Sequence, residues 1–326
     1  MKYVGMYAQV RDNNFKSMLL LLMFPCILLG MMWVCIAILA SMNEYSYNWV
    51  ADANEQFLAA APWVIGGVAV WFAIAYAFNA SMIESATNSR PLERKENPRV
   101  YNIVENLTMT CGMDMPKINI INSPELNAFA SGINRNSYTV TVTTGLLNVL
   151  NDAELAGVIG HELTHIRNRD TRLLITSIIF VGIVSTLMSL LSRLIYDMMW
   201  YGGGSSSRKR DKEGGGASVF IVMIVALICS AIAYVFVLLT RFAISRKREY
   251  MADAGGAELC GDAFALASAL RKISGNPGLG EVGRSDIAQL YIALPEMKLS
   301  GFSSFMGNLF STHPDINRRI EILEQF

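Results

Sequence analysis

Residues 18–40 form a run of more than twenty residues without a charged side chain, MLLLLMFPCILLGMMWVCIAILA. A helix of that length crosses a hydrocarbon core of about 30 Å. Further uncharged runs occupy residues 57–78, 173–192 and 217–240. Charged residues make up 17% of the chain, whereas an ordinary soluble domain has about 25%. These features predict an integral membrane protein that is mainly α-helical.

Basic residues flank the first two runs on one side. Three precede residue 18 and four lie between 90 and 99, whereas residues 41–56 between the runs carry only acidic charges. The positive-inside tendency then places both ends of this hairpin, and the segment that follows it, in the cytoplasm. The loop at 201–216 is basic and rich in glycine and serine. It is predicted to be flexible, and two arrangements of the surrounding runs stay open: full crossing, or a hairpin that only partly enters the bilayer.

The remaining segments predict a catalytic domain in two parts. We assign residues 1–80 to a transmembrane hairpin, 81–171 to the first part, 172–240 to a second hydrophobic hairpin and 241–326 to the second part. In the first part, residues 98–111 have helical periodicity, and residues 117–122 and 137–147 are rich in β-branched residues. We expect a small antiparallel β-sheet there. Helices are expected at 244–259, at 262–273 and from about 314 onward.

Two of the three histidines lie four residues apart in the sequence HELTH, which is residues 161–165. On a helix this spacing puts His161 and His165 on one face, where both imidazoles can bind one ion. Glu162 projects about 100° around the helix, so it is poorly placed as a ligand but can reach a water molecule on the metal. This is the arrangement of a zinc hydrolase with a glutamate general base.

A catalytic zinc site needs a third protein ligand and one open position. Glu249 lies at the start of the predicted helix after the fourth run, with Asp253 one turn later. Glu249 can bind the metal, and Asp253 can accept a hydrogen bond from a ligand imidazole. Taken alone, Glu249 would be read as a surface ion pair with Arg246 or Lys247, and the need for a third ligand is what favours metal binding. His313, the remaining histidine, is the competing ligand.

These motifs together resemble the HtpX family of membrane zinc metalloproteases, which are related to the CAAX prenyl proteases. The resemblance rests on HELTH, REYMADAGG around Glu249, NAFA at 127–130 and STHPDINRRI near the end, in this order between apolar runs. It covers nearly the whole chain. It implies a zincin-like (gluzincin) catalytic domain with one zinc ion held by His161, His165 and Glu249. It also makes Glu162 the base and Asp253 the residue that supports a ligand.

The resemblance further implies an endopeptidase in the bacterial inner membrane that faces the cytoplasm. Its substrates would be damaged or misfolded membrane proteins or unfolded polypeptides, in quality control and stress response. A further hypothesis is self-cleavage in the flexible loop, because proteolytic sites concentrate in exposed loops.

Two more groups of residues complete the predicted site. His313 and Arg318 are candidates to stabilise the negative charge that develops on the scissile carbonyl oxygen. Asn127, Ala128, Phe129 and Ala130 are expected to form an exposed edge strand to which a peptide substrate adds through its backbone. Phe129 is also a candidate core residue, since neighbouring residues of a strand face opposite sides.

Other functions fit the sequence less well. A membrane scaffold with a structural metal would need a fourth ligand in place of the open position, and a transporter would need ionisable residues inside the apolar runs. The formal net charge of zero argues against nucleic-acid binding.

Overall fold

The computed structural model describes residues 6–41, 46–176, 245–275 and 315–325, with scattered helical residues between 179 and 234. The loop at 201–216, most of the runs at 173–192 and 217–240, and His313 lie outside the described residues. The chain divides into two units. The first comprises Met1–Ser17, Ala75–Ile178 and Thr240–Phe326, and the second comprises Met18–Ile74 and Ile179–Leu239.

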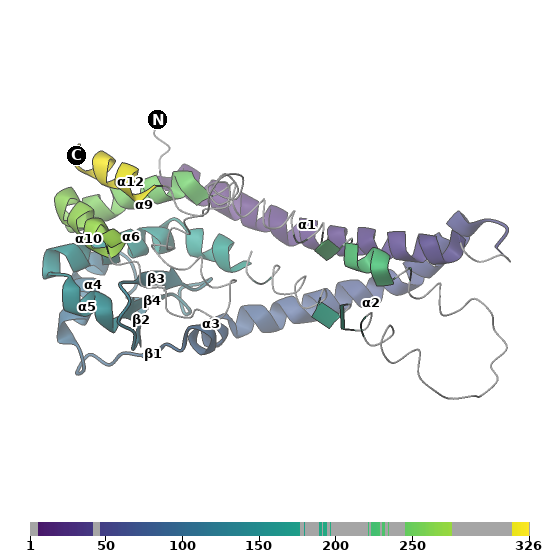
Figure 1. Ribbon diagram of the computed structural model, residues 1–326, viewed down its shortest axis with the longest axis horizontal. Helices are drawn as coiled ribbons and strands as arrows, with labels where there is room; N and C mark the ends of the chain where they lie inside the picture. Colours follow the sequence, from purple (N-terminus) through teal and green to yellow (C-terminus); the bar gives the residue numbers. More distant parts are fainter. Residues whose placement is uncertain are drawn as a thin grey trace. The chain divides into compact units, whose positions relative to one another are not determined.

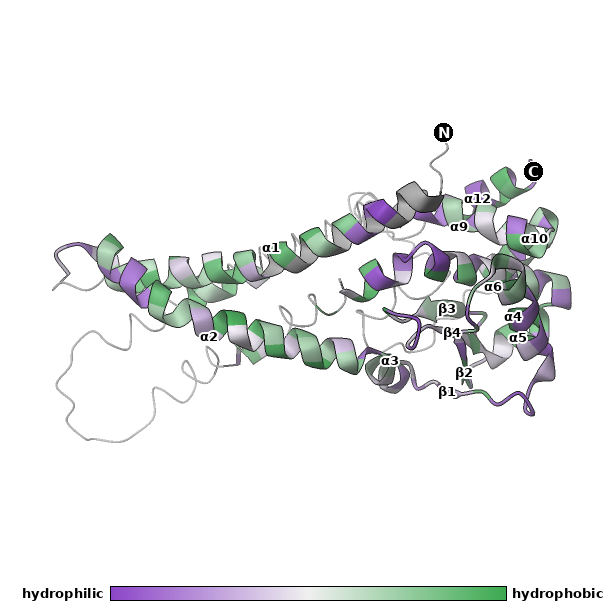
Figure 2. Ribbon diagram, turned by 180° about the vertical axis from the view of Figure 1, so that it is seen from behind, coloured by the Kyte–Doolittle hydropathy of each residue, from purple (hydrophilic) through white to green (hydrophobic). Residues whose placement is uncertain are grey.

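The second unit contains most of the long helices α1 (Met6–Ser41) and α2 (Trp49–Ala77). Both are apolar along much of their length (Figure 2). Trp33 Nε1 donates a hydrogen bond to Asn54 Oδ1 at 2.9 Å and so joins the two helices. In the described part of the chain, α2 alone is long and apolar enough to cross a membrane, and it contains nearly all of the expected span 57–78. The apolar stretch of α1, Pro25–Ser41, is shorter.

The first unit contains a four-stranded sheet whose order is β1-β2-β4-β3. Its strands are β1 (Arg90–Pro91), β2 (Lys117–Ile121), β3 (Ala128–Ser131) and β4 (Thr139–Thr143). The expectation of a wholly antiparallel sheet is wrong, because β2 pairs with β4 in parallel, and only the β1–β2 and β3–β4 pairs are antiparallel. The parallel pair arises because β4 inserts between β2 and β3. Every residue of β4 is buried, as expected for a strand covered on both faces.

Seven helices of the first unit have described bounds. They are α3 (Asn79–Thr87), α4 (Pro98–Cys111), α5 (Thr144–Val149), α6 (Asp152–Arg167), α9 (Ser245–Cys260), α10 (Ala263–Gly275) and α12 (Ile316–Leu323). The expected helix at 98–111 is confirmed. The expected strand at 137–147 is partly wrong, since its last residues begin α5. The Thr143 hydroxyl accepts a hydrogen bond from Leu146 N and so caps this helix.

Helix α6 lies at the centre of the first unit (Figure 1). It packs against β3 and β4 as well as α4, α9 and α10. A continuous apolar core joins these elements, and among its fully buried members are Val104, Val142, Leu155, Ile159 and Leu266. The helix that carries both histidines is therefore held by packing on several sides.

Candidate metal centre

A capping box starts α6 two and a half turns before the first histidine. Asn151 Oδ1 accepts a hydrogen bond from Glu154 N, and Glu154 Oε2 accepts one from Asn151 N, both at 2.9 Å. The helix then runs without a break through His161 and His165. Their Nε2 atoms lie 3.1 Å apart, and the two rings are nearly perpendicular at 86°. The expected convergence of the two imidazoles is confirmed.

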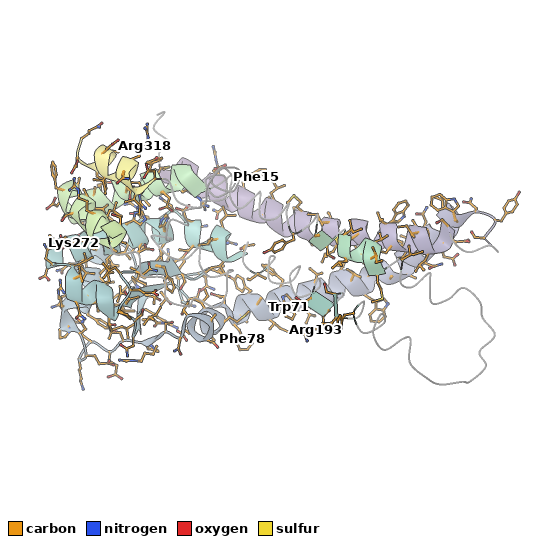
Figure 3. All side chains as sticks on the ribbon, in the orientation of Figure 1. Phe15, Trp71, Phe78, Arg193, Lys272 and Arg318 are labelled. Carbon is orange, nitrogen blue, oxygen red and sulfur yellow. The ribbon has the colours of Figure 1, made fainter. Side chains whose placement is uncertain are left out.

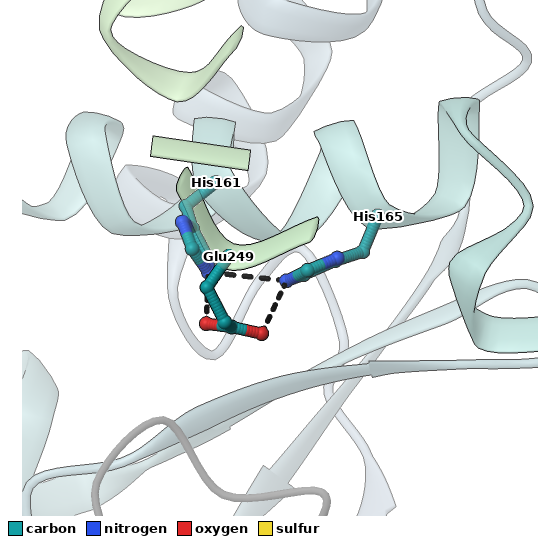
Figure 4. Close-up of side chains that lie close together, drawn as sticks. All are labelled: His161, His165 and Glu249. Carbon is teal, nitrogen blue, oxygen red and sulfur yellow. Dashed lines mark hydrogen bonds and ion pairs between the residues drawn. The ribbon is translucent and has the colours of Figure 1, made fainter. Parts of the chain in front are cut away.

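Glu249 reaches the two histidines from α9 (Figure 4). Its Oε2 lies 3.7 Å from His161 Nε2, and its Oε1 lies 3.6 Å from His165 Nε2. Ligands about 2.1 Å from a tetrahedral zinc ion are roughly 3.4 Å from one another. The three observed separations, 3.1, 3.6 and 3.7 Å, therefore suit one such ion. The structure brings Glu249 to this place by packing α9 against α6, and its side chain is buried.

The other nitrogen of each histidine faces a carboxylate. His161 Nδ1 lies 3.0 Å from Asp253 Oδ1, and His165 Nδ1 lies 2.9 Å from Asp170 Oδ2. A carboxylate beside Nδ1 favours the tautomer that carries its hydrogen there and leaves the Nε2 lone pair for a metal ion. Two lone pairs 3.1 Å apart repel each other unless a proton or a metal cation lies near both. The donor set thus fits a divalent cation.

The pKa values of the histidines agree with this arrangement. Burial lowers the pKa of His161. Burial also acts to lower the pKa of His165, but the hydrogen bond to Asp170 and the charge of Glu249 outweigh it and raise that pKa to about 9. The site therefore attracts a positive charge at neutral pH. A metal ion that takes this place releases a proton.

Glu162 lies beside the cluster and is buried. Its Oε2 accepts a hydrogen bond from Ala130 N at 2.6 Å. Burial raises the pKa of Glu162 to about 7, and the negative charge of Glu249 acts in the same direction. A carboxylate with a pKa near neutrality suits proton transfer at physiological pH.

Arg319 enters the site from α12, which the sequence did not lead us to expect. Its Nε and Nη2 donate to Asp253 Oδ2 and Oδ1 at 2.8 and 2.7 Å, and its Nη1 lies 3.5 Å from Glu249 Oε2. Burial acts to raise the pKa of Asp253, but Arg319 holds it down at about 2. Arg319 thereby fixes the carboxylate that faces His161.

The expectation that Arg318 faces the site is corrected. Arg318 lies on the exposed side of α12 (Figure 3). The helical stripe that packs inward consists of Ile316, Arg319, Ile320 and Leu323, at spacings of three and four residues. Arg319 occupies a position on this stripe and Arg318 does not. The periodicity of the stripe was the signal that could have identified the correct arginine.

Strand β3 forms one edge of the sheet, as expected. The expectation that residues 127–130 are exposed is wrong, because Asn127 and every residue of β3 are buried. Asn127 O accepts a hydrogen bond from Thr143 N of β4 at 3.0 Å, so Asn127 and Thr143 form a hydrogen-bonded pair of the antiparallel ladder. By the alternation of an antiparallel ladder, the backbone groups of Ala128 and Ala130 point away from β4. The Ala130 N–H accordingly reaches Glu162.

Phe129 is a core residue. It is 2% exposed and packs against Ile83 and Ala86 of α3, and against Ile121 and Leu174. This is the structural role that the sequence left open for it. Ala128 and Ala130, one residue on either side, belong to the main core next to α6.

The close approach of α9 to α6 depends on Gly256. A Cβ atom at this position would lie 2.8 Å from His161 N and 3.0 Å from His161 Cα. Because backbone atoms cannot yield easily, Gly256→Ala should push α9 from α6, weaken metal binding and cost about 1–3 kcal/mol of stability. Metal titration and thermal unfolding of the full chain measure both effects.

Gly275→Ala is the matched control for that substitution. Gly275 ends α10 in the same unit, and a Cβ atom there meets nothing within 4 Å. It should leave metal affinity unchanged. Equal metal affinity in Gly256→Ala and the wild type would contradict the close packing of the two ligand-bearing helices.

Three comparisons with known proteins each found a match to this chain. The model of Peptidase family M48 matches residues 94–326. A "Protease HtpX homolog" of Bacteroides fragilis is 51% identical over 330 residues and covers 100% of both chains. A protein of the same name from Streptococcus mutans is 36% identical, over 98% of this chain and 99% of the relative. The crystal structure of S. mikatae Ste24p matches 97% of this chain and 67% of that chain, with 18% identity and a TM-score of 0.47.

Proposed function

Because this chain belongs to Peptidase family M48, as the matched region and the HtpX relatives establish, we propose that it is a zinc-dependent endopeptidase. The observation that carries the proposal is the cluster of His161, His165 and Glu249, with the buried carboxylate of Glu162 beside it. Three protein ligands leave a fourth position for water, which distinguishes a catalytic zinc site from a closed structural one.

The residues of the site have different roles in peptide hydrolysis. A zinc ion held by the three ligands would polarise the scissile carbonyl and acidify a water molecule. Glu162 takes the proton from that water and passes it to the leaving amine, a role that its pKa of about 7 supports. Asp253 and Arg319 keep His161 in the orientation that turns its Nε2 toward the ion.

The outward edge of β3 is the proposed binding place for substrate. The outward backbone groups of Ala128 and Ala130 can pair with an extended peptide once the Ala130 N–H exchanges its hydrogen bond from Glu162 to the peptide, which then lies beside Glu162. Recognition through the backbone selects little by sequence, and it suits unfolded polypeptides and damaged membrane proteins as substrates. In this proposal His313 stabilises the charge on the carbonyl oxygen. Substituting His313 and measuring the cleavage rate tests that role.

We place the protease in the bacterial inner membrane, with several crossings and its catalytic part in the cytoplasm. Helix α2 and the distribution of basic residues around the first two apolar runs support this placement. Quality control of membrane proteins is the proposed physiological role. Self-cleavage at 201–216 is part of the same proposal, because the loop is rich in glycine and serine.

Removal of metal tests the endopeptidase proposal. The purified full chain in detergent should cleave an unfolded polypeptide such as casein, lose that activity with a chelator, and regain it with one equivalent of zinc per chain. Glu249→Gln should bind zinc at least about 100-fold more weakly, because one of three ligands is lost. Fluorescence of labelled casein, elemental analysis and the intact mass of the protease are the measurements.

Glu258→Gln provides the control, since Glu258 lies on the same helix and is exposed. It should retain both zinc and activity. Cleavage that continues undiminished in the chelated protein would overturn the metalloprotease proposal. A wild-type protein that holds zinc and cleaves no substrate would instead favour a membrane scaffold, and an intact mass that never changes would contradict self-cleavage.

A further inference from the structure

The chain makes an unusual turn directly after the metal-binding helix. Helix α6 ends at Arg167, and residues 170–176 are helical again. Between them Arg169 has a φ of 59°, a left-handed conformation that residues other than glycine rarely adopt. Its side chain also donates a hydrogen bond to Asn14 Oδ1 at 3.1 Å. A strained residue of this kind persists only where the surrounding structure holds it.

The turn has a definite result at the next residue. It brings the Asp170 carboxylate back toward the last turn of α6, where Oδ2 lies 2.9 Å from His165 Nδ1. Asp170 is 5% exposed. A regular continuation of α6 would place residues 165 and 170 about 140° apart around the axis, so this contact depends on the reversal at Arg169.

The second oxygen of Asp170 faces the other ligand-bearing helix. Arg248 Nη1 lies 3.6 Å from Asp170 Oδ1, and the Arg248 side chain is largely buried. Arg248 directly precedes Glu249 in α9. The Asp170 carboxylate therefore connects His165 of α6 with Arg248 of α9, the residue directly before Glu249.

This arrangement repeats the one around the other histidine. Asp253 faces His161 and is held by Arg319, while Asp170 faces His165 and lies next to Arg248. Each imidazole thus has its own carboxylate and arginine. The Arg248 contact is longer than the Arg319 contact, so we expect it to contribute less.

We propose that Asp170 positions His165 for metal binding and that Arg248 holds Asp170 in place. The proposal rests on the metal centre proposed above. Asp170 is a positioning residue, because it acts through His165 and touches neither substrate nor metal. It fixes the hydrogen on Nδ1 and turns the Nε2 lone pair toward the ion. The competing explanation is that Asp170 only caps the helix that begins there.

Asp170→Asn separates the two explanations. Asparagine caps helices about as well as aspartate does, but it removes the negative charge that faces His165 and Arg248. Competition with a chromophoric chelator, using the full chain in detergent, should show zinc binding about 10-fold to 100-fold weaker. The absorption spectrum of the cobalt-loaded variant should also change, which a capping role would not cause. Thermal unfolding of the metal-free protein reports any loss of stability separately, because the substitution also removes the charge opposite the largely buried Arg248 side chain.

A second variant decides the question if Asp170→Asn does not fold. Arg248→Gln should weaken zinc binding by about threefold or more, and its effect should shrink when it is combined with Asp170→Asn. Asp152→Asn is the matched control, because Asp152 lies in the first turn of α6 and is exposed. It should leave zinc affinity and the cobalt spectrum unchanged.

Wild-type zinc affinity and a wild-type cobalt spectrum in Asp170→Asn would overturn the positioning role. A wild-type chain that binds no zinc would overturn it as well, together with the metal centre. A wild-type chain that binds zinc but cleaves nothing would overturn the endopeptidase proposal alone, because the affinities of the variants could still be compared.

Discussion

Glu162→Gln should lower the rate of peptide cleavage by about 10²-fold to 10⁴-fold while zinc binding stays at the wild-type level. General acid–base catalysis contributes about that much to an enzymatic rate. Glutamine has nearly the same shape, and its side-chain oxygen can still accept the hydrogen bond from Ala130 N. It cannot take a proton from water at neutral pH. Glu162 is not one of the three clustered ligand residues, so the metal should remain.

The measurement combines kcat for an unfolded substrate with elemental analysis of the same preparation. Glu258→Gln makes the same chemical change at an exposed position and should leave both values unchanged. If Glu162→Gln cleaves at the wild-type rate, another group is the base. If it loses its zinc, then Glu162 is needed for the ligand cluster itself.

Arg319→Leu should destabilise the fold by about 3–5 kcal/mol, the usual cost of breaking a buried ion pair by removing one partner. Arg319 is 1% exposed and Asp253 is 2% exposed, so the substitution leaves a negative charge in the interior. The carboxylate would also lose the two hydrogen bonds that orient it toward His161. Zinc affinity should therefore fall together with stability.

Two further variants separate these effects. Arg318→Leu changes the exposed neighbour and should alter stability by no more than about 0.5 kcal/mol. The double variant Asp253→Leu, Arg319→Leu removes both charges, so it should recover much of the stability. It should still bind zinc weakly, because His161 lacks its carboxylate. Denaturant unfolding and zinc titration measure the two quantities, and an Arg319→Leu variant as stable as wild type would contradict the buried pair.

Much of the candidate site could be predicted from local sequence. His161 and His165 lie within one helix, and the geometry of a helix sets their distance regardless of what surrounds it. The capping box at Asn151 and Glu154 is local in the same way and is present in the structure. Glu249 could be proposed because a catalytic metal needs a third ligand and few candidates were available. The HtpX resemblance added the expected endopeptidase activity and substrate class, which local geometry could not supply.

The errors came from contacts between distant segments. The sheet is mixed and not antiparallel because β4 lies between β2 and β3, an order that alternation within single strands does not reveal. Arg318 is the candidate that the sequence offers, and only the buried stripe of α12 shows that the neighbouring Arg319 faces the site instead. Asp170 was overlooked because its contact with His165 requires the left-handed turn at Arg169.

Helical spacing alone thus specified the two histidines and the glutamate beside them, since neighbouring residues of a helix keep the same relation in any fold. Packing alone specified the groups that surround them. Arg319 and Asp253 are separated by 66 residues, and they meet because α12, α9 and α6 bury their apolar faces together. Such pairing depends on the free energy of the assembled core, which no short stretch of sequence contains.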